Sequence, residues 1–253
     1  MVIDMHTHLW VGLFEQNRAE IRQAMELYGI DRVYVSGLNN ALPDEEQVEE
    51  LNREVRIFMD QEPGRVRGYV YVNPCNPNAA DVVRRWIEDG GMDGIKLWIS
   101  ALCDAPCVYP VAELAIGYGV PILVHAYHKA TGQLPNESVG RHVANLARRY
   151  PEAKLIMAHL GGNCYDGLPA VRDCPNVWVD QSGSVFRGDD MAYAMEMVGC
   201  DRILHGSDMP GPYLVNLGQV LACAEGEERQ KILHQNAERI FDRTFRPPGR
   251  AKQ

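Results

Sequence analysis

Short apolar runs alternate along this chain with longer stretches of amphipathic character. Two of the runs, Ile122–Val124 and Leu155–Met157, are apolar without interruption, as expected of parallel strands that are covered on both faces. The runs predicted as strands are Val2–His6, Arg32–Ser36, Gly68–Val72, Gly94–Trp98, Pro121–His125, Lys154–His159, Asn176–Asp180 and Arg202–Gly206. The pattern therefore predicts short strands distributed over the whole sequence.

Between the predicted strands lie stretches in which apolar residues recur at helical spacing. The predicted helices are Asn17–Tyr28, Asp44–Met59, Ala79–Glu88, Val111–Tyr118, Glu137–Tyr150, Asp189–Val198 and Val215–Cys223, with Glu228–Arg243 as an additional terminal helix. Gly29, Gly119 and Gly199 stand shortly before the next strand, which is typical of a glycine at the C-terminus of a helix.

The repeated order of strand and helix indicates a parallel sheet. A chain of 253 residues without a linker or low-complexity stretch fits one closed barrel, which commonly takes about 250 residues. We therefore predict a (β/α)8 TIM barrel with an extra C-terminal helix, as a single domain over residues 1–245 followed by a tail over 246–253. The competing prediction is an open doubly wound sheet. It normally has a glycine-rich loop after its first strand, where this chain has His6-Thr7-His8.

Candidate chemistry gathers at the predicted strand ends, where barrels of this kind place their functional side chains. His6 and His8 lie two positions apart, so an extended strand points both to one face with their Cβ atoms about 6–7 Å apart. Other strands contribute His125, His159, Asp208 and, within the fourth strand, Lys96. Nitrogen and oxygen ligands around an open position are typical of a catalytic zinc-type site.

These residues lie in ordered motifs that resemble the amidohydrolase superfamily, and within it the amidohydrolase-related group that includes aminocarboxymuconate semialdehyde decarboxylase. The matching segments are Asp4-Met5-His6-Thr7-His8, Val124-His125-Ala126, Ala158-His159-Leu160-Gly161-Gly162, Gly206-Ser207-Asp208-Met209-Pro210 and the closing stretch Ile232–Phe241. Together they sample nearly the whole predicted barrel in the order of the family.

The resemblance implies that His6, His8, His125 and Asp208 bind one divalent metal ion. Zn²⁺ is the first choice, with Mn²⁺, Fe²⁺ or Co²⁺ as alternatives. It also implies that Asp208 and His159 are catalytic, with His159 as a general acid/base or as a group that polarises the substrate. Lys96 stays open: a carboxylated lysine would bridge to a second metal ion, whereas an ammonium would pair with Asp208 or bind a substrate carboxylate.

Three further residues are candidates for substrate binding. Trp98 ends the fourth predicted strand, His128 follows His125, and Arg187 lies after the seventh strand as a cation for an anionic substrate. A solvated loop arginine is an equally good interpretation of Arg187.

Composition limits the partners and the compartment. The formal net charge of −9 argues against a nucleic-acid partner, and no apolar run reaches the length of a membrane span. Seven cysteines without a framework spacing favour reduced thiols, so we expect a cytoplasmic protein. Cys103 and Cys107 form a C-x3-C pair that we interpret as ordinary thiols rather than metal ligands.

The function predicted first is hydrolysis of an ester, lactone or amide bond in a small organic substrate by a metal-activated water. The alternative is metal-dependent, non-oxidative decarboxylation of a small unsaturated or aromatic carboxylic acid, since both reactions can use the same residues. A metal-binding protein without turnover is the third hypothesis. The short chain leaves little room for a lid, so we also expect a homodimer in which a second subunit completes the pocket.

Overall fold

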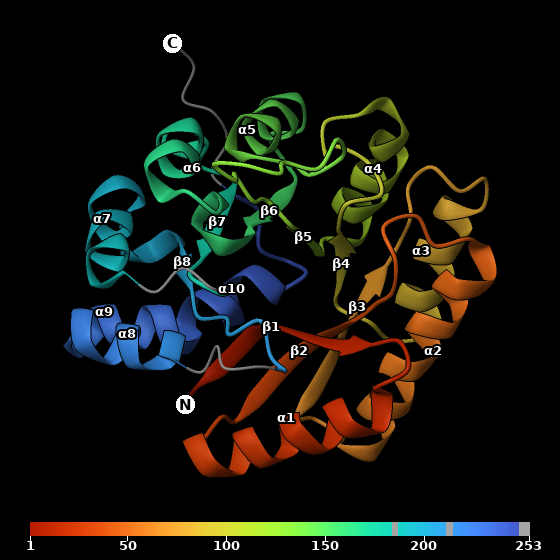
Figure 1. The fold of residues 1–253 in the computed structure, drawn as a ribbon, viewed down its shortest axis with the longest axis horizontal. Helices are drawn as coiled ribbons and strands as arrows, with labels where there is room; N and C mark the ends of the chain where they lie inside the picture. The colour runs from red at the N-terminus through yellow and green to blue at the C-terminus, as the bar shows by residue number, and fades with distance from the viewer. Residues whose placement is uncertain (184–186, 211–214, 248–253) are drawn as a thin grey trace.

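The computed structural model describes residues 1–183, 187–210 and 215–247. Parallel strands form one sheet in sequence order, and helices surround it (Figure 1). The strands are β1 (Ile3–Trp10), β2 (Arg32–Leu38), β3 (Val66–Tyr71), β4 (Gly94–Leu97), β5 (Pro121–Val124), β6 (Lys154–Met157), β7 (Val177–Asp180) and β8 (Ile203–Leu204). The predicted (β/α)8 TIM barrel is confirmed.

The helices follow the strands in the predicted alternation. They are α1 (Phe14–Tyr28), α2 (Glu45–Gln61), α3 (Ala79–Glu88), α4 (Tyr109–Tyr118), α5 (Gly140–Arg149), α6 (Cys164–Val171), α7 (Gly188–Val198), α8 (Val215–Cys223), α9 (Gly226–Gln230) and α10 (Asn236–Phe241). Among the described residues no helix is both long and apolar enough to cross a lipid bilayer.

Backbone hydrogen bonds close the barrel between β1 and the chain that follows β8. The Met5 N–H donates to the His205 carbonyl at 3.0 Å, and the Asp208 N–H donates to the His6 carbonyl at 2.7 Å. The His8 N–H donates to Met209 O at 2.6 Å, next to a parallel bridge between Thr7 and Met209. The first and last motifs of the sequence therefore lie side by side.

Apolar side chains fill both sides of the sheet. A large cluster packs between the strands and the surrounding helices, and a second cluster draws on nearly all strands and on α10. Tyr34 on β2 stacks on Phe241 with ring centroids 3.7 Å apart, and the Tyr69 hydroxyl donates to the Met5 carbonyl at 2.9 Å. The interior of the barrel is therefore packed at the end that α10 covers, which leaves the opposite rim for polar chemistry.

Several predicted boundaries differ from the structure, and four of these differences bear on the site or on an element of the barrel. β1 runs on to Trp10, so His8 lies inside the strand rather than after it. Helix α6 was not predicted; its eight residues include Pro169 and follow paired glycines, which conceal a helical pattern. The predicted terminal helix is divided by the π-helical turn Lys231–Gln235. Helix α5 begins at Gly140 rather than Glu137, because the Glu137 carboxylate is engaged by His125 and Lys129.

Candidate metal centre and its surroundings

His6, His8 and Asp208 bring three ligand atoms together at the rim. His8 Nε2 lies 3.0 Å from His6 Nε2 and 3.0 Å from Asp208 Oδ1, and His6 Nε2 lies 3.6 Å from Asp208 Oδ1. Ligands of a tetrahedral zinc ion with bonds of about 2.0–2.1 Å are about 3.3–3.4 Å apart, and an octahedral ion brings them slightly closer. The donor set and its spacing therefore fit a divalent cation without selecting zinc over other metals.

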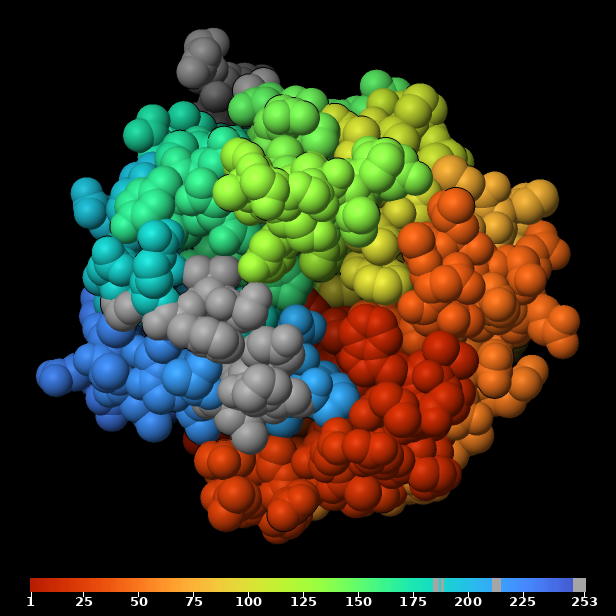
Figure 2. Space-filling model, viewed as in Figure 1, coloured from red at the N-terminus to blue at the C-terminus, as the bar shows by residue number. Residues whose placement is uncertain are grey.

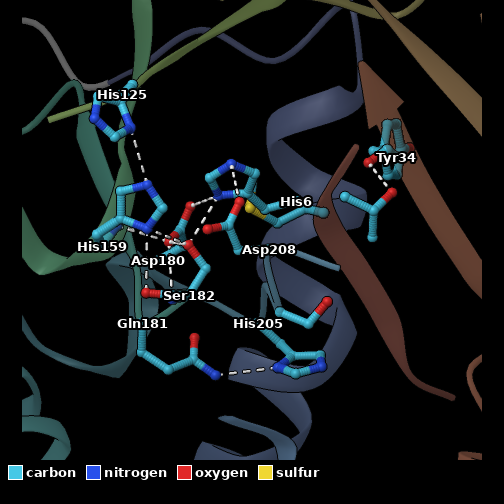
Figure 3. A network of polar contacts seen from close by, with 12 residues as sticks. His6, Tyr34, His125, His159, Asp180, Gln181, Ser182, His205 and Asp208 are labelled. Carbon is cyan, nitrogen blue, oxygen red and sulfur yellow. Dashed lines mark hydrogen bonds and ion pairs between the residues drawn. The ribbon is translucent and has the colours of Figure 1, made fainter. Parts of the chain in front are cut away.

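Both histidines are held from behind by their other ring nitrogen. His6 Nδ1 contacts Asp180 Oδ2 at 3.0 Å and Ser182 Oγ at 2.9 Å, and His8 Nδ1 contacts Ser36 Oγ at 2.9 Å. A partner that accepts the Nδ1 proton leaves Nε2 free to ligate and fixes the orientation of the ring, as in the carboxylate–histidine pairs behind many metal ions. Figure 3 shows His6 between Asp180, Ser182 and Asp208.

The charges at the centre suit metal binding. Burial, together with the positive charge of Lys96, holds the pKa of His6 well below its ordinary value and lowers that of His8. Burial alone would raise the pKa of Asp208, but the contact with His8 and the nearby imidazoles hold it well below its usual range. Neutral imidazoles and an ionised carboxylate are the protonation states that a metal requires.

Backbone strain is concentrated at the same place. Within the described part of the chain, the residues other than glycine with positive φ are His159 at 59°, Leu160 at 48° and Asp208 at 67°. Side chains with a Cβ rarely adopt this conformation, and such residues cluster at functional sites. Gly206 allows the close approach of β8 to β1, because a Cβ there would lie 2.8 Å from His6 Cβ.

His159 and His125 form a pair of imidazoles next to the centre. His159 Nε2 lies 3.1 Å from His125 Nδ1, and His159 Nδ1 lies 2.9 Å from Ser182 Oγ. The His159 ring centroid is 5.1 Å from that of His6. His125 Nε2 contacts Glu137 Oε1 at 3.1 Å, so protein groups engage both of its ring nitrogens. The role of His125 as a fourth ligand stays a prediction.

Lys96 reaches the centre from β4. Its side chain is fully buried, and its Nζ lies 2.9 Å from His6 Nε2. Burial lowers the pKa of Lys96 to about 8, against the opposing attraction of Asp208 and Asp180. This pKa lies closer to neutral pH than that of an ordinary lysine, which is compatible with either interpretation given to Lys96.

Of the three predicted substrate residues, Trp98 is connected to the centre through a neighbouring ring. Trp98 packs edge-on against Trp10 with centroids 5.8 Å apart, and Trp10 packs edge-on against His8 at 6.2 Å. In Figure 2 red atoms of the N-terminal segment reach the surface beside yellow atoms of the loop after β4. Trp98 is therefore connected to His8 through Trp10, and its role in substrate binding stays a prediction.

The other two candidates point to outer groups. His128 is partly exposed, and its Nδ1 lies 2.9 Å from Asp166 Oδ2. Arg187 is 62% exposed and pairs with Asp190 at 3.4 Å, at the start of α7. The contacts described for both residues therefore lie outside the metal centre, and their roles in substrate binding remain predictions.

Asp180, Ser182 and Glu137 are site residues that the sequence analysis missed. Asp180 accepts hydrogen bonds from the backbone N–H groups of His159 at 2.9 Å and Ser182 at 3.0 Å, in addition to its contact with His6. A signal was present, because Asp180 is the polar residue that ends the apolar run of β7, as His125 follows β5. Glu137 gave no such signal, since it stands in a polar loop.

His6, His159 and Asp180 form a second group with converging ligand atoms. The Ser182 hydroxyl contacts all three of them. We therefore interpret this group as the support behind the centre, and His6, His8 and Asp208 as the better place for an ion.

Comparison with known families agrees with this arrangement. Residues 3–243 match the family described as Amidohydrolase. The chain belongs to the amidohydrolase family. The match spans every strand of the barrel and includes His6, His8 and Asp208. No curated protein matches the sequence.

Solved structures share the fold over nearly the full length. A 2,6-dihydroxybenzoate decarboxylase from Rhizobium has a TM-score of 0.75 and 17% identity, covering 95% of this chain and 98% of its own. A dihydroxybenzoic acid decarboxylase from Polaromonas, with bound manganese and the inhibitor 2-nitroresorcinol, has a TM-score of 0.74 and 18% identity, covering 95% and 96%. A 4-oxalomesaconate hydratase from Rhodopseudomonas palustris has a TM-score of 0.71 and 17% identity, and the match covers 96% of each chain. At these identities the likeness establishes the fold alone.

Proposed function

We propose that this amidohydrolase-family protein is a metal-dependent, non-oxidative decarboxylase of a small aromatic or unsaturated carboxylic acid. The observation that carries the proposal is the combination of the His6, His8 and Asp208 cluster with a fold shared by several decarboxylases of hydroxylated benzoic acids. Hydrolysis, which the sequence analysis put first, has less support from these comparisons and becomes the competing reaction in the test.

His6, His8 and Asp208 would hold the metal ion, and His125 is the further ligand that the family resemblance implies. When bound, such an ion supplies positive charge that anchors and polarises oxygen atoms of the substrate. Lys96 Nζ, buried beside His6, adds a second positive group on the same side when it is protonated. Trp98 and Trp10 offer ring faces and edges to a planar substrate.

Decarboxylation breaks the bond between the ring carbon and the carboxylate, releases carbon dioxide and requires a proton at that carbon. His159 is suited to deliver this proton because its buried ring lies beside His6 and its Nε2 contacts a second imidazole, His125. Asp208 is held in its ionised form, which suits a ligand. We therefore assign proton transfer to His159 and metal binding to Asp208.

The test measures both reactions on the same preparations. Protein loaded with Mn²⁺ or Zn²⁺ is incubated with dihydroxybenzoates and 5-carboxyvanillate, and separately with aryl esters and lactones. We expect carbon dioxide release with at least one acid. Ester or lactone hydrolysis without any decarboxylation would contradict the proposal and restore the hydrolase.

Variants locate the chemistry. The double variant His6→Ala/His8→Ala should lose the metal and the activity together. His159→Asn should keep the metal but lower kcat by about 10²–10⁴-fold, the usual contribution of a general acid or base. His234→Ala is the matched control, because His234 lies in the terminal π-helical turn and bonds Glu238 and Gln230.

A further inference from the structure

Two cysteines from different loops meet on the same rim as the metal centre. Cys75 follows β3, and Cys107 lies in the 3-10 turn Pro106–Val108 that follows β4. Their Sγ atoms are 2.8 Å apart, closer than the roughly 3.5–4 Å that ordinary non-bonded contacts keep. The C-x3-C pair noted in the sequence is therefore divided: Cys107 faces Cys75 instead of Cys103.

The backbone on each side of this contact is held in place. The Cys75 N–H donates to Asn73 Oδ1 at 3.1 Å, and the buried Asn73 amide donates in turn to the Pro43 carbonyl at 2.9 Å. On the other side, the Val108 N–H donates to the Ala105 carbonyl at 2.9 Å, which fixes the turn around Cys107. The two sulfur atoms therefore meet without rearrangement of either loop.

Access to solvent differs among the three rim cysteines. Cys75 is exposed, Cys107 is partly buried and Cys103 is buried. Burial raises the pKa of the Cys103 thiol to about 12, and burial together with the contact to Cys75 raises that of Cys107 to about 11. An external reagent therefore meets Cys75 first, since reactivity follows exposure and thiolate character.

We propose that Cys75 and Cys107 form a reversible disulfide that joins the loops after β3 and β4. The oxidant is a low-molecular-weight disulfide such as oxidised glutathione. The Cys75 thiolate attacks one sulfur of the reagent, breaks its S–S bond and releases one thiolate. Cys107, having lost its proton to solvent, attacks the Cys75 sulfur and releases the second thiolate. The protein loses two protons and two electrons, and the reagent is reduced to two thiols.

The bridge encloses the segment 75–107, which carries α3, β4, Lys96 and Trp98. Within it the Ser100 hydroxyl donates to the Ala41 carbonyl at 2.9 Å, so the segment is already attached to the loop after β2. Because a cross-link reduces the freedom of the unfolded chain, the oxidised protein should melt at a higher temperature, by roughly 5–10 °C.

The experiment follows thiols and melting temperature in a series of glutathione redox buffers. The reduced protein should present seven thiols after denaturation, and the oxidised protein five, with a mass lower by about 2 Da. A non-reducing peptide map should join the peptides of Cys75 and Cys107. Cys75→Ser and Cys107→Ser should each abolish the bridge and the rise in melting temperature, whereas Cys103→Ser should keep both.

Three results would overturn the proposal: seven free thiols in every buffer, a bridge between Cys103 and Cys107, or glutathione that stays attached to Cys75 without ring closure. The map of the unmodified protein identifies the pairing even if the Cys103 variant does not fold. None of these readouts depends on the enzymatic reaction, so failure of the proposed decarboxylation leaves this test intact.

Discussion

The two ends of the barrel each bury a lysine, and the two lysines are satisfied in different ways. Lys154, the first residue of β6, lies at the end covered by α10 and donates to the carbonyls of Gly119, Ile240 and Asp242 at 2.9, 3.0 and 2.6 Å. Lys96, in β4, contacts a single ring nitrogen of His6 at 2.9 Å. Burial lowers the pKa of both to about 8.

The difference separates a structural charge from a functional one. Three carbonyl acceptors complete the hydrogen-bonding capacity of the Lys154 ammonium and tie α10 to the barrel. Lys96 instead has donor capacity beyond its contact with His6, one of the candidate metal ligands. A buried polar group that is left partly satisfied costs stability, so we predict that Lys96 contributes to activity rather than to stability.

The surroundings of the two lysines repeat this contrast. The packed end is closed by aromatic rings such as Tyr34, Phe241 and Trp178. The rim buries Asp180 and several imidazoles, and it contains all the described residues other than glycine that have positive φ. Stability and chemistry are thus assigned to opposite ends of the same strands, as in other barrels.

Replacement of Lys96 gives the largest expected effect. Lys96→Met should lower kcat/KM for the accepted substrate by about 10²–10³-fold, because a preorganised positive group at the reacting centre is lost. The free energy of unfolding in urea should stay constant or rise, because an apolar side chain needs no partner there. Loss of stability together with activity would contradict the contrast and make Lys96 structural.

Replacement of Lys154 should do the reverse. Lys154→Met leaves three carbonyls without their donor, so we expect the free energy of unfolding to fall by about 2–4 kcal/mol. The activity of each folded molecule and the metal content should not change. Lys154→Arg is the matched control because it keeps the charge while changing the geometry of donation. Unchanged stability of Lys154→Met would show that solvent replaces the lysine at this end.

Much of the difference between the packed end and the polar rim could be predicted from the sequence, because each strand is an apolar run followed by polar residues. The apolar runs located the strands, and the polar residues at their C-terminal ends located His6, His8, Lys96 and Asp208. His6 and His8 follow from alternation along one strand, which needs no knowledge of tertiary contacts, whereas Asp208 lies beyond the end of β8 and was predicted from its motif.

His159 was predicted from its motif, but its placement, like the contacts of Glu137 and Cys75, depends on backbone that leaves the strands. His159 lies two residues beyond β6 in the 3-10 turn Ala158–Gly161, where its positive φ directs the ring toward His125. Alternation along a strand does not predict the direction of a side chain in such a turn. Glu137 and Cys75 meet their partners across loops, and loop conformation is decided by tertiary contacts. The predicted tail, residues 246–253, lies from residue 248 onward outside the described part of the chain.

The smallest expected effect is the pH dependence of stability that His205 causes. His205 shares the rim with the metal centre, but we expect it to affect stability rather than activity. Its Nδ1 accepts from Gln181 Nε2 at 3.0 Å, away from the ligand cluster (Figure 3), and burial lowers its pKa from 6.5 to about 4. Between pH 6.5 and about 4, His205 therefore binds a proton in the unfolded chain but not in the folded chain. Stability contributed by this group is present at neutral pH and falls as the pH drops from about 6.5 toward 4.

The loss from His205 should reach about 2 kcal/mol by pH 5 relative to pH 7.5. His205→Gln removes the titrating ring, so the difference in unfolding free energy between wild type and variant should narrow by this amount over that interval. Urea unfolding at pH 7.5, 6 and 5 measures it, with metal removed by chelation from every sample. If the free energy of unfolding changes with pH in the same way in wild type and His205→Gln, the imidazole is protonated in the folded state. Water would then reach this part of the rim in spite of its packing.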